Sequence, residues 1–258
     1  ENVQKGVFDL ATRLYGITFK EVNNIPLYHP EVKTYEVYDN DGSFLAVLYT
    51  DFFPRESKGG GAWMTQFRGQ KMVDGKDQRP LVSLVMNFTK PTDTKPSLLT
   101  FNEVTTFLHE FGHALHGMFS KCTYGSTSMD GVSRDFVELP SQFMENYALE
   151  KEWLDTWAVH YQTGEKIPQE YIDKIKKSSN FQAGYASDRQ LSFGMVDMAW
   201  HTITEPVTEP LADFEQRAMG KTEIMPLVKG SAFSPAFGHI FAGGYAAGYY
   251  GYKWAEVL

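Results

Sequence analysis

Residues 109–116 read HEFGHALH, so three of the chain's seven histidines fall within about two turns of one predicted helix. On an α-helix, residues that are four apart lie on the same face, about one turn from each other. His109 and His113 can therefore present two imidazoles to a single metal ion, as zinc requires. Glu110 lies about 100° around the helix from His109, which places its carboxylate beside such an ion rather than on it. The segment thus predicts a helix that carries a metal site.

The alternative is an ordinary helix with histidines on an exposed, polar face. The segments next to the motif argue against it, because TFL before His109 and FG after Glu110 are largely apolar and indicate a buried helix. Buried imidazoles and carboxylates need polar partners, and a metal ion supplies them. The HExxH spacing is typical of metalloproteases, in which the glutamate is the general base. His116 lies about 10 Å along the axis from His109, so we expect it to pack beside the site or to hydrogen-bond a ligand, with a third-ligand role as the alternative.

A catalytic zinc ion takes three protein ligands and keeps one position for water, so the third ligand should come from another element. The segment RDFVELPSQFMENY, residues 134–147, offers Glu138 in apolar surroundings, where an unpaired carboxylate would be costly. From spacing alone two interpretations stay open: Glu138 is the third ligand, or it forms a salt bridge with an arginine such as Arg134. Glu145, seven residues later on the same helical face, is placed to hydrogen-bond a metal ligand.

The C-terminal segment contains a second group of polar residues. His239 follows a Phe-Gly pair, and Tyr245, Tyr249 and Tyr252 occupy positions i, i+4 and i+7 of a predicted final helix. Taken alone, such a row of tyrosines on one helical face favours aromatic packing. The glycines at positions 243, 244, 248 and 251 indicate close backbone approach or a mobile segment.

Hydrophobic periodicity predicts a mainly helical chain with a small β-sheet near its start, an α+β fold. Residues 33–39 and 44–53 form a hairpin around DNDGS, and residues 81–89 form a buried strand. We expect residues 1–100 to hold one helix and the sheet, and residues 101–258 to form the helical part with the metal site. The expected helices are 1–15, 102–119, 135–156, 168–178, 181–203, 210–219 and a last one that opens after the segment GSAFSPAFGHIFAGG.

Bulk composition excludes several classes of protein. The formal net charge is −8 and the Lys and Arg residues are scattered, so no nucleic-acid surface is expected. No segment reaches the roughly 18–20 apolar residues of a membrane helix. The single cysteine, Cys122, rules out an intrachain disulfide and fits a reducing compartment. The chain starts without an initiator methionine and ends in a helical pattern, so we expect a piece of a longer protein.

Four segments together resemble the thimet oligopeptidase family of zinc peptidases, and the resemblance covers nearly the whole chain. They read FLHEFGHALHGMFS, YGSTS, RDFVELPSQFMEN and FGHIFAGGYAAGYYGYKWAEV. The resemblance implies a zincin-like, neurolysin-like fold. It also implies that residues 1–258 are one catalytic region, the C-terminal part of a longer chain.

The same resemblance implies roles for individual residues. One Zn²⁺ would be held by His109, His113 and Glu138, with Glu110 as general base. In the family, a histidine and tyrosines of the C-terminal segment hydrogen-bond the substrate carbonyl as it becomes an oxyanion, and preorganised donors of this kind are worth on the order of 3–4 kcal/mol each. The matching residues are His239, Tyr245 and Tyr252, with Tyr249 as a substrate-binding residue.

The resemblance implies zinc-dependent hydrolysis of short peptides. We expect a peptidyl-dipeptidase, which releases C-terminal dipeptides, and an oligopeptidase A-like endopeptidase is the alternative. A peptidyl-dipeptidase needs a group that grips the terminal carboxylate. Arg55, Lys58 and Arg68 are candidates, although solvated surface charges are the simpler interpretation. A rival from another class is a non-catalytic peptide-binding domain with a residual zinc site.

The resemblance also implies a deep channel between two largely helical halves. The missing N-terminal half of the same protein would form the opposite wall, so this piece alone should fold and bind zinc but cleave peptides poorly. We expect a monomer in the cytoplasm, with the periplasm as the alternative. Cobalt or manganese could replace zinc at such a site.

Overall fold

The computed structural model describes residues 1–225 and 228–258. The contacts within the chain divide it into two compact units, which are described separately. The first unit comprises Glu1–Val132 and Pro140–Asp173, and the second comprises Ser133–Leu139 and Lys174–Leu258.

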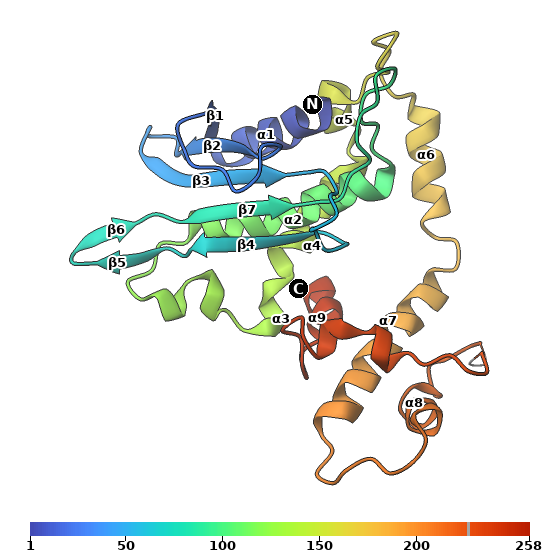
Figure 1. Cartoon of the computed structure of the whole chain (residues 1–258). Coiled ribbons are helices and arrows are strands. Elements are labelled where there is room, and N and C mark those ends of the chain that lie inside the picture. Colours follow the sequence, from blue (N-terminus) through green and yellow to red (C-terminus); the bar gives the residue numbers. More distant parts are fainter. Residues whose placement is uncertain (226–227) are drawn as a thin grey trace. The chain divides into compact units, whose positions relative to one another are not determined.

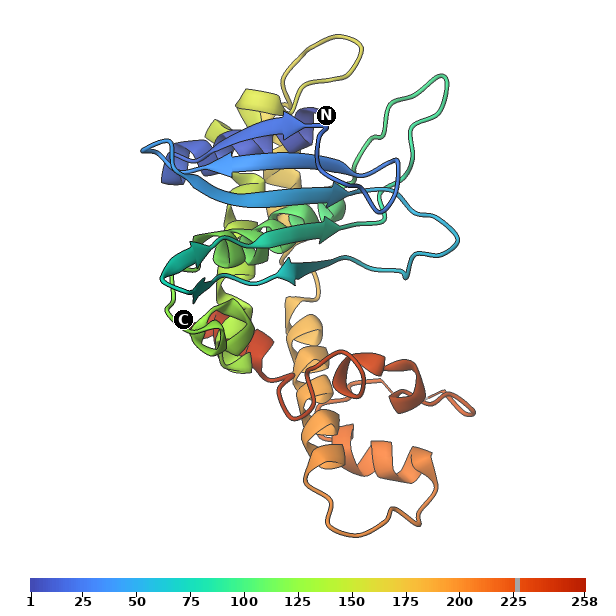
Figure 2. The ribbon, with the colours of Figure 1, turned by 60° about the vertical axis from the view of Figure 1, so that its left-hand side comes forward.

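The first unit is built on a five-stranded sheet with the strand order β1-β2-β3-β7-β4, shown in Figures 1 and 2. The pair β3–β7 is parallel, whereas β1–β2, β2–β3 and β4–β7 are antiparallel. The strands β5 and β6 form a separate antiparallel hairpin. The strands are β1 Thr18–Val22, β2 Lys33–Tyr38, β3 Phe44–Asp51, β4 Trp63–Arg68, β5 Lys71–Val73, β6 Lys76–Gln78 and β7 Leu81–Val85.

Two helices pack against one face of this sheet, α1 (Asn2–Tyr15) and α2 (Phe101–Phe119) (Figure 1). They meet each other through Phe8 and Phe111, whose ring centroids lie 5.9 Å apart. The apolar side of α2, which includes Phe107 and Phe111, is fully buried with Leu48 and Leu84 of the sheet. Burial of these large side chains stabilises the contact of α2 with the sheet, since each contributes about 1.5–3 kcal/mol.

The start of α2 is fixed by a capping box. The hydroxyl of Thr100 accepts the backbone N–H of Glu103, and the Glu103 carboxylate accepts the backbone N–H of Thr100. Two of the otherwise unsatisfied donors at the helix N-terminus are thereby satisfied. The first unit is completed by most of α4 (Leu139–Glu145), by α5 (Lys151–Trp157) and by the start of α6 (Gln169–Ser178).

The second unit is helical over its described residues. Its longest helix is α7 (Ala183–His201), which packs with α8 (Leu211–Met219) through Val196, Ala218 and Met219. The short helix α3 (Arg134–Val137) packs with the last helix, α9 (Gly251–Val257). Two 3₁₀ turns, Ser234–Ala236 and Gly238–Ile240, precede α9.

These elements confirm the α+β fold class and most of the predicted elements. The hairpin of residues 33–53 is β2–β3, the buried strand is β7, and the helices expected at 1–15, 102–119, 168–178, 181–203 and 210–219 correspond to α1, α2, α6, α7 and α8. Within residues 1–225 and 228–258, no helix is both long enough and apolar enough to cross a membrane.

Two predicted helices are wrong. The helix expected at 135–156 is divided into α3, α4, a 3₁₀ turn at Asn146–Leu149 and α5, because the backbone turns at Glu138 and becomes extended at Glu150. The last helix starts only at Gly251. Tyr245 and Tyr249 therefore lie in turns before it, and the tyrosines do not share one helical face.

Candidate metal centre

The two motif histidines lie one turn apart on α2, with ring centroids separated by 5.0 Å and ring planes at 82°. Glu138 directly follows α3. Each of His109, His113 and Glu138 offers one potential ligand atom, and these three atoms lie within 4.8 Å of one another. Two imidazoles and a carboxylate are a ligand set that suits zinc and leaves a fourth position for water. The donor chemistry and the close grouping therefore fit a single zinc ion.

Burial of this group supports the same interpretation. The side chains of His113 and Glu138 are 8% and 1% exposed, and His109 is half-buried. A carboxylate in such a position needs compensation by a positive charge or by hydrogen bonds. A divalent ion held by the three residues would provide that charge.

Glu145 supports the first histidine. Its carboxylate oxygen Oε1 lies 2.6 Å from Nδ1 of His109. A carboxylate at this nitrogen fixes the orientation of the ring and favours metal binding through the other nitrogen, Nε2. The structure thus places Glu145 against a candidate ligand.

The close approach of α2 to α4 depends on a glycine. A Cβ atom on Gly112 would lie 2.3 Å from the carbonyl oxygen of Pro140 and 2.6 Å from Cα of Ser141. Without a side chain at Gly112, the backbone of α4 packs directly on the turn between the two histidines. Because Glu138 precedes Pro140 by two residues, this contact helps to set where the candidate third ligand lies.

The other polar residues of the motif are also partly or fully buried. Glu110 is 7% exposed, so its carboxylate is largely shielded from solvent. His116 is half-buried, and burial, with a smaller effect of the neighbouring His113, lowers the pKa of His116 below its usual value. His116 is therefore neutral at pH 7.

In the second unit, three of the predicted residues contact one another. Nε2 of His239 lies 2.8 Å from the hydroxyl of Tyr252, and the His239 ring stacks on Tyr245 at a centroid distance of 4.3 Å. The hydroxyl of Tyr245 donates a short hydrogen bond to Oε1 of Glu138. The guanidinium of Arg134 lies over the ring of Tyr245, 4.9 Å from the ring centroid.

The protonation of this cluster follows from its burial. Burial, followed by the charge of Glu138, raises the pKa values of Tyr245 and Tyr252 far above the usual range. Burial also lowers the pKa of His239, although Glu138 partly opposes this effect. At pH 7 both phenols are therefore protonated donors, and the imidazole is neutral.

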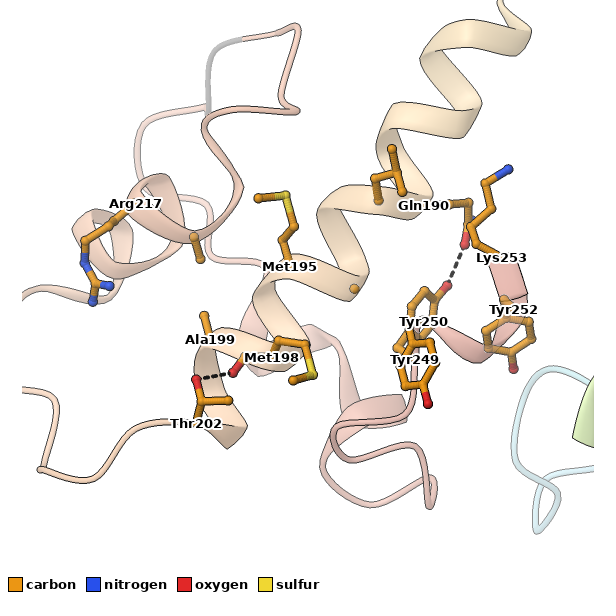
Figure 3. A pocket seen from close by; sticks show the side chains of 13 residues that line it. Gln190, Met195, Met198, Ala199, Thr202, Arg217, Tyr249, Tyr250, Tyr252 and Lys253 are labelled. Carbon is orange, nitrogen blue, oxygen red and sulfur yellow. Dashed lines mark hydrogen bonds between the residues drawn. The ribbon is translucent and has the colours of Figure 1, made fainter. Parts of the chain in front are cut away.

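Tyr249 is oriented differently from the other two tyrosines. Its hydroxyl donates to the side-chain oxygen of Gln190 on α7 at 3.0 Å, as Figure 3 shows. The residue is 8% exposed, and its ring packs against Phe193. In this structure the Tyr249 hydroxyl is thus used to attach the C-terminal segment to α7.

Comparison with known proteins adds a decisive observation. The whole chain, residues 1–258, matches the family described as Peptidase family M3. The chain belongs to peptidase family M3. It is 43% identical over 258 residues to a dipeptidyl carboxypeptidase of Salmonella typhimurium, and 43% identical over 260 residues to oligopeptidase A of Escherichia coli. A thimet-like oligopeptidase of Dictyostelium discoideum is 36% identical over 263 residues.

These alignments cover 99%, 98% and 100% of the M3 chain but only 38%, 38% and 39% of the three relatives. The chain thus spans about two fifths of the length of the curated relatives that it matches. Membership of family M3 confirms the resemblance to the thimet oligopeptidase family that the sequence motifs indicated.

The basic residues considered as carboxylate anchors are engaged within the M3 chain. Arg55 donates to both carboxylate oxygens of Asp51 at 2.9 Å, and Nζ of Lys58 donates to the same carboxylate at 3.0 Å. The Lys58 side chain is 2% exposed, so it is not a solvated surface charge. Arg68 donates to the backbone oxygen of Arg79.

Sequence reasoning missed several polar residues of the second unit. Asp197 is fully buried on α7 and binds the backbone around Tyr249, while Gln190 binds the Tyr249 hydroxyl. No local pattern marks these two residues, since their partners in the C-terminal segment are 50 or more positions away in the sequence. A pocket of about 540 Å³ was also missed; it lies on the same unit, and its lining includes Gln190, Met195, Met198, Arg217, Tyr249 and Lys253 (Figure 3).

Proposed function

We propose that the protein to which this chain belongs is a zinc-dependent peptidase that acts on short peptides. The observation that carries the proposal is the group formed by His109, His113 and Glu138, whose ligand atoms lie within 4.8 Å of one another beside the motif glutamate. The relatives add support, because their names describe a carboxypeptidase and oligopeptidases.

Zinc would be held by His109, His113 and Glu138, with Glu145 orienting the first histidine through Nδ1. When bound, zinc supplies a Lewis acid that polarises a carbonyl and makes water more acidic. The chain itself then has to hold the ligands, move protons and stabilise the developing negative charge. We propose that His116 packs beside the ligands, since it is half-buried and neutral.

Glu110 is proposed as the general base. Support for this role comes from its place next to His109 on α2 and from its burial, which shields the carboxylate from bulk water. It accepts a proton from the attacking water and returns that proton to the leaving amine. General base catalysis of this kind contributes about 10²–10⁴-fold to the rate.

His239, Tyr245 and Tyr252 are proposed to stabilise the oxyanion. Support comes from their mutual contacts and from the hydrogen bond of Tyr245 to Glu138, which links the cluster to a candidate ligand. Both phenols stay protonated at neutral pH, so they can donate to an oxyanion. Tyr249 is proposed to contact substrate through its ring, since its hydroxyl is bound to Gln190.

For the products, we propose the release of C-terminal dipeptides, with endopeptidase action on short peptides as the alternative. The identities of 43% to a dipeptidyl carboxypeptidase and 43% to an oligopeptidase A support both equally. Digestion of one peptide with a free C-terminus and of the same peptide with an amidated C-terminus separates them. A peptidyl-dipeptidase should lose most of its activity on the amidated peptide, whereas an endopeptidase should cleave both.

The remaining proposals concern the whole protein. We propose a monomer in which further chain from the same protein lies opposite this region, so that residues 1–258 alone cleave peptides poorly. Residues 1–258 would act as one catalytic region. For its location we propose the cytoplasm, supported by the single unpaired Cys122.

The test of the function is Glu110→Gln in the full-length protein. Zinc content, measured on the purified protein, should equal that of the wild type, while kcat should fall by about 10²–10⁴-fold. His109→Ala is the matched comparison, because it should lose the metal as well as the activity. A Glu110→Gln enzyme with normal kcat would refute the assigned base, and a wild-type protein that holds little zinc would favour the non-catalytic peptide-binding alternative.

A further inference from the structure

Asp197 is a buried carboxylate on α7 that holds the backbone of the C-terminal segment. It is 0% exposed. Its Oδ1 accepts the backbone N–H of Ala247 and its Oδ2 accepts that of Tyr249, both at 2.9 Å. The Nδ1 atom of His201, one turn later on α7, lies 2.8 Å from Oδ1. Both carboxylate oxygens are thus used, and two backbone amides two residues apart converge on them.

The backbone that Asp197 holds has an unfavourable conformation. Ala247 has a φ of +51°, in the left-handed region, where a Cβ atom lies too close to the following carbonyl oxygen. Such a conformation in a residue other than glycine persists only when surrounding contacts impose it. The hydrogen bond from the Ala247 amide to Asp197 is a contact of this kind, because it is made at the strained residue itself.

The held turn lies between two of the proposed catalytic tyrosines. Tyr245, two residues before Ala247, donates its hydroxyl to Glu138, and Tyr252, three residues after Tyr249, contacts His239. The rings of Tyr245 and Tyr252 stack on each other at a centroid distance of 5.3 Å. A change of φ at Ala247 would rotate the chain on either side and separate these rings.

We propose that Asp197 is a positioning residue for the peptidase reaction: it imposes the turn at residues 247–249 that places Tyr245 and Tyr252. The proposal rests on the function proposed above for these tyrosines. Asp197 acts on these tyrosines through the backbone amides of Ala247 and Tyr249 that it holds. The double acceptor is essential, since an asparagine keeps one oxygen and presents an NH₂ group to the second amide.

The test compares Asp197→Asn with Glu215→Gln in the full-length protein. Glu215 on α8 is the matched control, because it is also 0% exposed and accepts two backbone amides, those of Phe233 and Ser234 at 3.0 and 2.7 Å. Asp197→Asn should lower kcat by at least about 30-fold, since misplaced oxyanion donors cost on the order of 10²-fold. KM and zinc content should change less than about 3-fold. Both variants should lower the urea midpoint by a similar amount. Glu215→Gln should nevertheless keep kcat within about 3-fold of the wild-type value.

Two further measurements separate positioning from a loss of stability. Adding Ala247→Gly to Asp197→Asn should raise kcat at least about 3-fold above that of Asp197→Asn alone, because glycine adopts the turn without the steric cost. Hydrogen exchange in the absence of substrate should show that Asp197→Asn loses protection at residues 245–249, while Glu215→Gln keeps it.

Several outcomes would overturn the proposal. They are a normal kcat in Asp197→Asn, an equal loss of kcat in both variants, or unchanged hydrogen exchange at residues 245–249. If the wild-type full-length protein binds zinc but cleaves no peptide, the proposed function fails. In that case the hydrogen-exchange result alone shows whether Asp197 holds the turn, so the two failures are distinguishable.

Discussion

The substitution Gly112→Ala tests whether the contact between α2 and α4 sets the candidate metal site. In an isolated helix, this change would stabilise the protein by about 1 kcal/mol, because alanine favours helix more than glycine does. Here the new Cβ would lie 2.3 Å from the carbonyl oxygen of Pro140, closer than the 3.0 Å that real Cβ atoms observe. The backbone of α4 would therefore have to move by about 0.7 Å, since moving the α2 backbone would disturb its buried contacts.

Overpacking of this kind costs about 1–3 kcal/mol, so we expect a net loss of stability of up to about 2 kcal/mol after the gain of about 1 kcal/mol in helix propensity. The shift would also move Glu138, two residues before Pro140, relative to its neighbours. Because metal sites tolerate deviations of only about 0.2 Å in ligand distance, zinc affinity should fall at least about 10-fold. Urea denaturation measures the first effect, and competition with a chromophoric chelator measures the second.

Gly194→Ala is the control for this experiment. Gly194 lies in the middle of α7, and the nearest atom to its added Cβ is Cα of Tyr250 at 4.0 Å, an ordinary contact. This variant should gain up to about 1 kcal/mol and bind zinc normally. If Gly112→Ala were as stable as Gly194→Ala and bound zinc as the wild type does, the inference that this close approach sets the site would be refuted.

Three other predictions follow from individual contacts. Glu145→Gln should weaken zinc binding about 10–100-fold in chelator competition, because it removes the carboxylate that orients His109; unchanged affinity would contradict this role. Tyr245→Phe should lower kcat by about 10²–10³-fold without loss of zinc, whereas Tyr250→Phe, whose exposed hydroxyl meets Asp135, should be nearly normal in the same assay. Burial alone would raise the pKa of Asp51, but hydrogen bonds from Arg55 and Lys58 hold that pKa below the usual value of an aspartate. This carboxylate therefore stabilises the fold above about pH 4 and loses the effect as the pH falls through its lowered pKa. Asp51→Asn should cost about 3–5 kcal/mol at pH 7 in urea denaturation, and a cost that does not decrease as the pH falls below about 4 would exclude this origin.

The sequence was sufficient to predict α2 and the residues on it, because every determinant of that helix is local. The capping box at Thr100 and Glu103, the apolar face with Phe107 and Phe111, and the i, i+4 spacing of the histidines all lie within twenty positions. The burial of Glu138 could also be inferred, since its neighbours are apolar. Spacing alone did not show whether Glu138 is a metal ligand or forms a salt bridge with an arginine, because a buried carboxylate can have either role.

The C-terminal segment shows where local patterns fail. The i, i+4, i+7 spacing of its tyrosines matches a helix, yet the backbone leaves the helical region at Gly244 and Ala247, with φ values of +82° and +51°. The cause is the carboxylate of Asp197, fifty positions earlier, which competes successfully for the amide of Ala247. The expected helix at 135–156 is divided at Glu138, just before the residues Pro140 and Ser141 that pack on Gly112 of α2.

The position of β7 between β3 and β4 has a consequence for synthesis of the chain. As residues leave the ribosome, β1, β2 and β3 can pair in order, but β4 has to wait for β7, which is made later and joins it to β3. The helix with the two histidines follows β7 directly in the sequence. The imidazoles of His109 and His113 thus leave the ribosome only after every strand of the sheet that α2 packs against, so α2 can pack on a complete sheet as soon as it is made.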